Sequence, residues 1–480
     1  MGASERAGLE ARLSELKGIS ENAQTAGGFD TVVIALGDSD ARLRRAAAWT
    51  LGSLKDIRGR VLLETALQDP DAAVRGTAAE SLGALALPRS REPLEAALGD
   101  PYARVRSQAA WALWAIADVA SLDALTPLLH DPDPSVRWSA ASAIGRLPTP
   151  ATFLPLSAAL SDTNDRVRRE AILGLGRLEQ AEVPDLVRRF LNDPARRVRV
   201  SAAVTLGRRR DRSSVPMLLE RIQRDESWVL PAVLVALGRI GDPSVASALV
   251  GAASRREAWV RVCAIHALGL LGVEEARGVA RAALNDPAWA VRGAGAECLA
   301  RVGGPEDLNR LLERLEDTHP WPRRGALHAI GQLGLTAAAP RVREELKHPV
   351  PEVRLAAVWA LGCLRDDGAK ESLVQMLRSL APTPGEVRTI AEGDGAVKLL
   401  SDAESRLFDA TVQALSRLSE GENDPVVLRA VSDARARVRD DELDRPARLP
   451  TFETASTSSI TLRQLFDGVL AAADDDELGC

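Results

Sequence analysis

The side chains with the clearest potential for chemistry are two histidines and a glutamate at equal spacing. His266, Glu297 and His328 follow one another at intervals of 31 residues, and imidazole and carboxylate groups are common zinc ligands. Zinc, however, requires every ligand atom to lie about 2 Å away. If each residue occupies a separate helix, and neighbouring helices pack about 8–10 Å apart, the two imidazoles are roughly 20 Å apart. We therefore predict no metal site.

Other catalytic arrangements are missing from the sequence. It contains no phosphate-binding Walker loop, no dinucleotide-binding glycine motif after a strand and no serine nucleophile elbow. The four cysteines, Cys263, Cys298, Cys363 and Cys480, are scattered without a C-x-x-C pair. Neither a zinc cluster nor a disulfide framework is indicated. We predict no catalytic residue, no cofactor and no enzymatic activity.

A recurring phrase indicates which elements carry these residues. Asp-Pro, Val-Arg, Ala-Ala and Leu-Gly follow one another in that order, and the arginine position returns every 31 residues. This position, the ladder position below, is held by Arg44, Arg75, Arg106, Arg137, Arg168, Arg199, Leu230, Arg261, Arg292, Arg323 and Arg354. A constant period of this length is typical of stacked helical repeats.

Each repeat is expected to form two helices. In the first helix, apolar residues such as Leu63 and Leu67 stand four apart, which places them on one face. The second helix is predicted to begin after an Asp-Pro pair such as Asp69-Pro70, with aspartate as N-cap and proline at the first helical position. The sequence thus predicts an all-α fold, an α-solenoid or superhelix of about twelve two-helix repeats.

The phrase resembles that of the HEAT family, in particular the short repeats of phycobilisome lyases, over residues 28–420. The resemblance implies that the second helices line a concave face and that Asp and Arg form a ladder between repeats. The ladder residues include Asp69, Arg75, Asp100, Arg106, Asp131, Arg137, Asp162, Arg168, Asp193 and Arg199. Arg224, Leu230 and Arg255 break the pattern, so we expect a weaker joint or changed curvature between 224 and 261. HEAT-repeat hydroxylases hold two irons with His-Glu dipeptides. This sequence contains no His-Glu dipeptide, so we do not expect hydroxylase activity.

The remaining segments differ in composition from the repeats. The expected organisation is an N-terminal capping helix over 1–27, the solenoid over 28–420 with an insertion at about 381–403, a C-terminal capping helix over 421–445, a flexible linker over 446–459 and an amphipathic tail helix with an acidic end over 460–480. The tail helix has two possible docking sites, the last repeat and a groove on a partner.

One column of residues is a candidate partner surface. Positions one and five residues after the ladder position point away from the core and vary between repeats, and exposed tryptophans are enriched at binding hot spots. The candidates are Trp49, Trp111, Trp138, Arg169, His266, His328 and Trp359. The alternative is that a tightly curved solenoid buries this column between neighbouring repeats.

A basic column stands nine residues after the ladder position and comprises Arg146, Arg177, Arg208, Arg239 and Arg301. Between Arg166 and Arg224 fifteen arginines accompany seven acidic residues, a local charge of about +8 in a chain of net charge −6. This asymmetry favours an anionic ligand or an acidic protein surface. A solvated face whose Arg stems cover apolar atoms would give the same pattern. Another set, Trp228, Trp259, Trp289 and Trp321, is expected to pack over the turns into the second helices.

These features favour a non-catalytic cytoplasmic scaffold or adaptor that binds partner proteins through the concave face. One alternative is a bilin lyase or chaperone-like protein, implied by the phycobilisome-lyase resemblance. Another is nucleic-acid binding through the Arg-rich central repeats, which the negative net charge disfavours. A cytoplasmic location is expected because the first 25 residues lack a signal-peptide pattern and no apolar run approaches the roughly 20 residues that span a bilayer.

Overall fold

The computed structural model describes residues 3–21, 28–224, 228–380 and 402–418, together with residues 427 and 429–431. Every regular element in these ranges is a helix, so the all-α prediction is confirmed. The chain divides into two compact units, unit 1 (Met1–Arg209) and unit 2 (Arg210–Cys480). The predicted insertion, C-terminal capping helix, linker and tail helix lie wholly or almost wholly outside the described residues. None of the described helices is long and apolar enough to cross a membrane.

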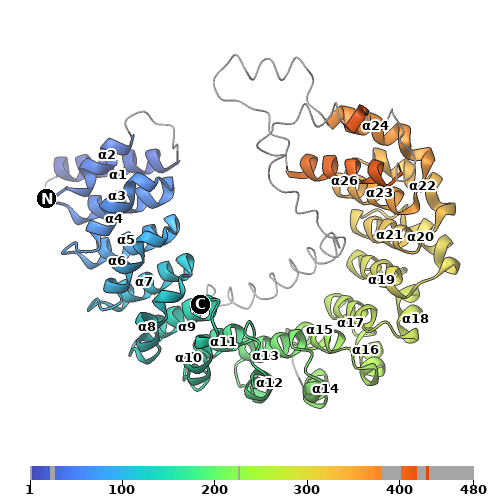
Figure 1. Cartoon of the computed structure of the whole chain (residues 1–480), viewed down its shortest axis with the longest axis horizontal. Coiled ribbons are helices and arrows are strands. Elements are labelled where there is room, and N and C mark those ends of the chain that lie inside the picture. The colour runs from blue at the N-terminus through green and yellow to red at the C-terminus, as the bar shows by residue number, and fades with distance from the viewer. Residues whose placement is uncertain are drawn as a thin grey trace. The chain divides into compact units, whose positions relative to one another are not determined.

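The described residues of unit 1 form one helix followed by six helical pairs (Figure 1). The first helix, α1 (Ala3–Glu21), occupies most of the predicted capping segment. The pairs are α2 (Gly28–Leu36) with α3 (Ala41–Leu54), α4 (Arg60–Ala66) with α5 (Ala72–Leu85), α6 (Arg91–Ala97) with α7 (Ala103–Ile116), α8 (Leu122–Leu125) with α9 (Pro134–Arg146), α10 (Phe153–Ala159) with α11 (Asp165–Leu175), and α12 (Val183–Arg188) with α13 (Arg196–Arg208).

Unit 2 contains a further six pairs among its described residues (Figure 1). They are α14 (Val215–Arg224) with α15 (Leu230–Ile240), α16 (Ala246–Ala252) with α17 (Ala258–Leu271), α18 (Glu274–Ala283) with α19 (Trp289–Val302), α20 (Leu308–Arg314) with α21 (Pro320–Gln332), α22 (Ala339–Glu344) with α23 (Pro351–Leu364), and α24 (Lys370–Leu380) with α26 (Asp402–Leu418). Two sets of six pairs agree with the predicted solenoid of about twelve repeats.

Short 3-10 helices accompany the first helices of many pairs. They are η1 (Ile57–Gly59), η2 (Pro88–Ser90), η3 (Val119–Ser121), η4 (Thr126–His130), η5 (Pro150–Thr152), η6 (Arg189–Asn192), η7 (Arg212–Ser214), η8 (Pro243–Val245), η9 (Pro305–Asp307), η10 (Thr336–Ala338), η11 (Glu345–Lys347) and η12 (Asp367–Ala369).

The second helices of each unit pack side by side in one layer. In unit 1 each of α3, α5, α7, α9 and α11 contacts the next second helix, and in unit 2 the same holds from α15 to α26. The first helices form the other layer, and the core lies between the two. Leu63 and Leu67, the apolar pair predicted for a first helix, are both buried there. Burying such a side chain contributes roughly 1.5–3 kcal/mol.

The glycine near the end of a second helix permits close packing against the next repeat. A Cβ atom on Gly83 would lie only 2.9 Å from the Cα atom of Ala112 in the neighbouring helix. The left-handed residue that ends the same helix is Ala86, three positions later. At this repeat the glycine therefore serves the approach of two backbones rather than the cap.

An Asp–Arg ladder joins consecutive repeats. The Arg44 side chain donates from Nε and Nη2 to the two Asp69 carboxylate oxygens, at 2.7 and 2.8 Å. Its Nη1 donates to the backbone oxygens of Asp38 and Ser39, so one guanidinium binds both its own repeat and the next. The same two-point pairing joins Arg75 to Asp100, Arg106 to Asp131, Arg137 to Asp162, Arg168 to Asp193, Arg261 to Asp286 and Arg292 to Asp317.

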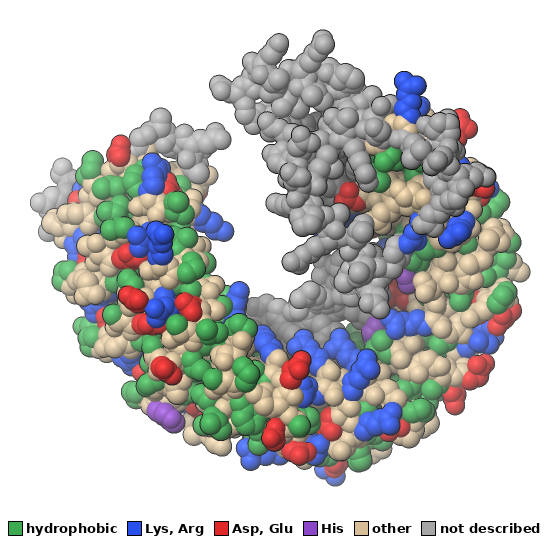
Figure 2. All heavy atoms as spheres, viewed as in Figure 1, with side chains coloured by type: hydrophobic (Ala, Val, Ile, Leu, Met, Phe, Trp, Pro, Cys, Tyr) green, Lys and Arg blue, Asp and Glu red, His purple; other side chains and the backbone are tan. Residues whose placement is uncertain are grey.

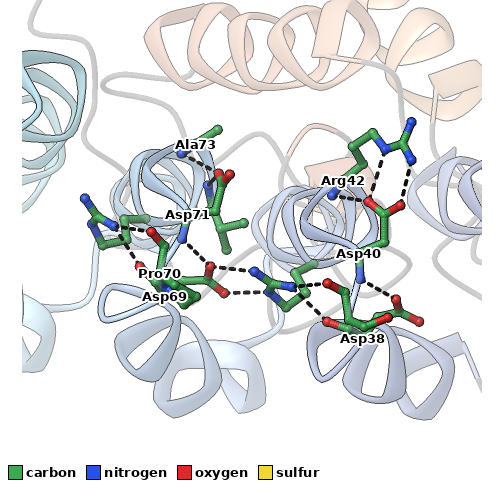
Figure 3. A network of polar contacts seen from close by, with 11 residues as sticks. Asp38, Asp40, Arg42, Asp69, Pro70, Asp71 and Ala73 are labelled. Atoms are coloured by element: carbon green, nitrogen blue, oxygen red, sulfur yellow. Dashed lines mark hydrogen bonds and ion pairs between the residues drawn. The ribbon is translucent and has the colours of Figure 1, made fainter.

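The predicted N-cap was misplaced by two residues in this repeat. Asp71, not Asp69, caps α5, because its side chain accepts hydrogen bonds from the backbone N–H groups of Ala73 and Val74. Asp69 instead receives the guanidinium of the preceding repeat, and its Oδ1 also accepts the Asp71 N–H at 2.8 Å (Figure 3). Asp69-Pro70 is therefore the turn before the cap.

Some repeats of unit 2 lack the Asp–Arg pair of the ladder and use other contacts. Leu230 stands at an arginine position, and Arg255, at an aspartate position, donates to the Ile222 backbone oxygen at 2.8 Å. The weaker joint expected there stays a prediction. Further along, His348 replaces the aspartate, and Arg323 pairs instead with Glu345 at 3.2 Å. The sequence pattern did not identify Glu345 because it lies three residues before His348, the position where other repeats carry the aspartate.

Candidate functional site

In unit 1 the predicted partner column is exposed at one end and buried at the other. Trp49 on α3 is 48% exposed and Trp111 on α7 is 37% exposed. Ser142 and Val204, which hold the same repeat position on α9 and α13, are buried. The column is therefore open to solvent in some repeats and buried between neighbouring repeats in others, and its role as a partner surface stays a prediction. A partner can reach the aromatic side chains of this column only toward its N-terminal end.

Three tryptophans form a continuous stack on α7 and α9. The Trp111 ring lies parallel to Trp114, with centroids 4.6 Å apart and planes at 7°, and 6.0 Å from Trp138. Trp114 was not among the residues predicted to contact a partner, because it occupies the position where most other repeats carry glycine. A tryptophan at a position that most repeats fill with glycine was the signal that could have identified it. We call Trp111, Trp114 and Trp138 the tryptophan stack.

Two arginines flank this stack. The Arg146 guanidinium lies 4.1 Å from the centroid of the Trp114 ring, and that of Arg166 lies 6.0 Å from Trp138. Both distances are within the range of cation–π attraction. The predicted contact Arg169 lies on α11 and forms an ion pair with Glu170 at 3.2 Å. Cations and aromatic faces thus alternate across three neighbouring second helices.

The basic column is exposed to solvent in both units. Arg146, Arg177 and Arg208 of unit 1 are exposed, as are Arg239 and Arg301 of unit 2. Arg177 donates to the Gly145 backbone oxygen at 2.8 Å. The protein shields part of this guanidinium from water although the residue keeps exposed surface, and this partial burial lowers its pKa. The neighbouring charges of Arg208 and Arg146 lower the pKa further, against the opposing charge of Glu170. Figure 2 shows Lys and Arg side chains gathered over α11 and α13. Such crowding of like charges favours an anionic partner.

In unit 2 the side chains five residues after the ladder position border a small cleft, which we call the polar cleft. His266 on α17, Glu297 on α19 and His328 on α21 all border it, and His328 stacks on Trp359 of α23 with centroids 4.7 Å apart. These three predicted contacts, His266, His328 and Trp359, are partly buried rather than exposed. In the part of the chain that the structure describes, no group of three His, Cys, Asp or Glu side chains could hold a metal ion.

The four tryptophans at the turns pack in pairs. Trp228 lies 5.9 Å from Trp259, and Trp289 lies 5.5 Å from Trp321 in an edge-to-face arrangement. Trp289 also stacks on His319 at 3.8 Å. Trp228 and Trp289 remain about half exposed, whereas Trp321 is 5% exposed. These contacts agree with the expected packing over adjoining turns.

The buried cysteines have the environment of unreactive thiols. Burial raises the pKa of the Cys263 and Cys298 thiols to about 12 in both cases. Because the thiolate is the nucleophilic form, a pKa this high leaves almost none of it at neutral pH.

Comparison with known proteins agrees with this architecture. A family model described as HEAT repeats matches residues 29–114, 122–204, 183–262, 252–327 and 309–392. A search of curated proteins by sequence gave no match.

Among solved structures, yeast importin-beta is similar with a TM-score of 0.58 and 14% identity, covering 85% of this chain and 70% of that one. The same yeast protein, in a study of its binding to RanGDP, gives a TM-score of 0.52 at 15% identity, covering 88% and 66%. Importin-beta in an ammonium sulfate condition gives 0.50 at 15% identity, covering 90% and 71%. The chain thus spans about two thirds of the length of these structures, and at such low identity the likeness concerns the fold alone. The 31-residue period, the Asp–Arg ladder and the matched family model together establish that the chain belongs to the HEAT-repeat family.

Proposed function

We propose that the chain is a cytoplasmic, non-catalytic scaffold or adaptor that binds a partner protein along the second helices of unit 1. The tryptophan stack carries this proposal. Trp111 keeps 37% of its surface exposed although its neighbours Trp114 and Trp138 hold it in place. A large aromatic surface left open to water is unfavourable for a soluble chain unless a partner covers it.

The stack is preorganised for binding. Trp114 and Trp138 both stack on Trp111, and the Arg146 guanidinium lies 4.1 Å from the Trp114 ring. Side chains held in this way lose little conformational entropy when a partner docks, so more of the contact energy becomes affinity. Tryptophan and arginine are also the residues most enriched at binding hot spots.

The basic column indicates the charge of the partner. Arg146, Arg177 and Arg208 are exposed beside the stack, and the surrounding repeats carry a local charge of about +8. An acidic protein segment that carries an apolar or aromatic side chain would satisfy both features. Binding of this kind uses shape and charge and requires no reactive group.

Affinity capture with three baits tests the proposal. The full chain is compared with Trp111→Ala and with Trp228→Ala, which removes a tryptophan that is 49% exposed from the turns of unit 2. We expect a specific protein to be retained by the full chain and by Trp228→Ala, and to be reduced at least tenfold with Trp111→Ala. A fourth bait that ends at residue 445 reports whether the tail segment takes part. Equal retention by Trp111→Ala and the full chain would argue against this surface.

The exposed arginines also favour a second candidate, nucleic acid, because stacking aromatic rings beside cations is a common way to bind single strands. A mobility shift with single-stranded DNA that weakens steeply with salt, and is lost in the Arg177→Glu, Arg208→Glu double variant, would support it. The phycobilisome-lyase resemblance suggests a third, bilin binding. Visible absorbance of the purified protein would support that function.

A further inference from the structure

The polar cleft of unit 2 is built by close helix packing. Its walls come from α17, α19 and α21, and its lining includes Gly269, Cys298 and Trp321. A Cβ atom on Gly269 would lie 3.2 Å from the Cys298 sulfur, so the glycine allows these two helices to approach. A Cβ atom on Gly293 would lie 2.9 Å from the Trp321 ring, so this second glycine provides the space that the indole fills.

The cleft is small, and four of its nine lining residues are histidine, glutamate or arginine. Its internal volume of about 20 Å³ is bordered by His266, Glu297, Arg301 and His328. A volume of this size holds about one water molecule, or one oxygen atom of a bound group. The indole N–H of Trp321 is buried beside the Glu297 carboxylate but makes no hydrogen bond of standard geometry. The site therefore has a buried donor that a ligand oxygen could satisfy.

Positive charge predominates around this cavity. Arg301 is exposed and borders the cleft. Its positive charge lowers the pKa of His266, of Glu297 and of His328. Arg324 of α21 is mostly buried, with a nitrogen 4.0 Å from a Glu297 oxygen. Glu297 is the only carboxylate among the lining residues. Burial and the charge of Arg301 lower the pKa of both imidazoles, with a further contribution from Arg239 at His266 and from Arg324 at His328. A cationic ligand would be repelled here.

We propose that this cleft binds the carboxylate of an acidic side chain presented by a partner, with Arg301 as the principal cation and the Trp321 N–H as a buried donor. The exposed guanidinium attracts the anion, and the cavity admits one of its oxygens. The inference rests on the proposed function only in naming a partner protein as the source. Short peptides test it independently of any captured protein.

Glu297 makes the binding dependent on pH. Burial raises the pKa of its carboxyl to about 7, against the lowering effects of Arg324, the Trp321 N–H and Arg301. The groups that face it are His266 from α17, Arg301 on its own helix, and Arg324, Trp321 and His328 from α21. When ionised, Glu297 repels the incoming carboxylate, whereas the protonated form does not. Binding should therefore take up a proton and weaken as pH rises.

The size of this effect follows from the titration. With a pKa of about 7, the protonated fraction of Glu297 falls from about 0.9 at pH 6 to about 0.1 at pH 8, which gives a roughly tenfold loss of affinity. The side chain of a glutamate ligand, with an ordinary pKa of about 4.3, stays ionised over this range.

Saturation-transfer NMR on the full chain tests the site. The probe is the blocked tripeptide acetyl-Gly-Glu-Gly-amide, and the uncharged acetyl-Gly-Gln-Gly-amide is its control. We expect the glutamate peptide to bind about tenfold more tightly at pH 6 than at pH 8, and the glutamine peptide not to bind. Arg301→Gln should abolish binding. Arg256→Gln, which changes an exposed arginine of unit 2 that precedes α17 and does not line the cleft, should leave it unchanged.

The variant Glu297→Gln separates this mechanism from general charge attraction. Because glutamine resembles the protonated carboxyl, binding should be as tight at pH 8 as in the unmodified chain at pH 6, and independent of pH. Circular dichroism checks that each variant is folded. Equal binding of the two peptides, unchanged binding by Arg301→Gln, or a retained pH dependence in Glu297→Gln would each overturn the proposal. Binding of free acetate with exclusion of the peptide would overturn the assignment to a side chain.

Discussion

Removing one arginine from the ladder should loosen one joint of unit 1. Arg137 makes four hydrogen bonds, two to the Asp162 carboxylate at 2.7 and 3.0 Å and two to the backbone oxygens of Asp131 and Pro132 at 2.9 and 3.2 Å. Its side chain is 15% exposed and that of Asp162 is 9% exposed. Arg137→Met keeps the aliphatic stem but leaves the Asp162 carboxylate without its cation.

The expected destabilisation follows from this burial. Removing one partner of a fully buried ion pair costs about 3–5 kcal/mol. Because this pair keeps some contact with water, and Asp162 still accepts the Asn164 N–H at 2.8 Å, we expect about 2–4 kcal/mol. Repeat arrays need not unfold in one step, so a local measurement is required.

Hydrogen exchange of the full chain provides that measurement. A loss of about 2–4 kcal/mol predicts exchange about 30- to 700-fold faster for amides of α9 and α11 when opening is at equilibrium. Amides of α3, three repeats away from α9, should change little. Arg104→Met, which removes an exposed arginine of α7, is the control and should shift stability by less than about 0.5 kcal/mol. Similar exchange in the Arg137→Met and Arg104→Met variants would refute the account of the ladder.

The same pair predicts a pH dependence. Burial alone would raise the pKa of Asp162, but hydrogen bonds from Arg137 and the Asn164 backbone outweigh it, and the net pKa is lowered. The carboxylate therefore contributes stability that is fully present above its ordinary pKa of about 4 and is lost as pH falls through the lower folded value. The difference between Arg137→Met and the unmodified chain should shrink below about pH 4.

Three further predictions concern packing and titration. Gly238→Val should destabilise unit 2 by more than about 2 kcal/mol in chemical denaturation, because a Cβ atom there would lie 2.7 Å from the Ala267 Cα atom. Cys263 and Cys298 should resist a thiol reagent at pH 7 until denaturant is added, since burial raises the pKa of both thiols to about 12; rapid labelling of the folded chain would contradict this. Burial and the charges of Arg301 and Arg239 lower the pKa of His266 to about 3, so its imidazole NMR signals should not shift between pH 5 and 8.

The sequence was sufficient for the architecture because the ladder requires a constant spacing. Arg44 reaches Asp69 in the next repeat only if each repeat has the same length, so the 31-residue period predicted both the stacking of helical pairs and the role of these side chains. The position of the N-cap was not predictable in the same way. Asp69 and Asp71 are both capping residue types, and which of them caps depends on the guanidinium of the preceding repeat.

The candidate site was predicted only in part. A helical wheel indicates which way a side chain points, but it does not indicate how closely the neighbouring helix approaches. Trp49 and Trp111 are exposed while Val204, at the same position, is buried. The cleft around Glu297 depends on the distances between three helices, which glycines such as Gly269 set through contacts with residues in another repeat.

The most direct test of the central claim is a hydrogen-exchange footprint of the chain with and without its captured partner. The account predicts slower exchange across α7, α9 and α11, where the tryptophan stack and its arginines lie, and no such protection in Trp111→Ala at the same partner concentration. Protection confined to the first helices of unit 1, with the second helices unchanged, would contradict it.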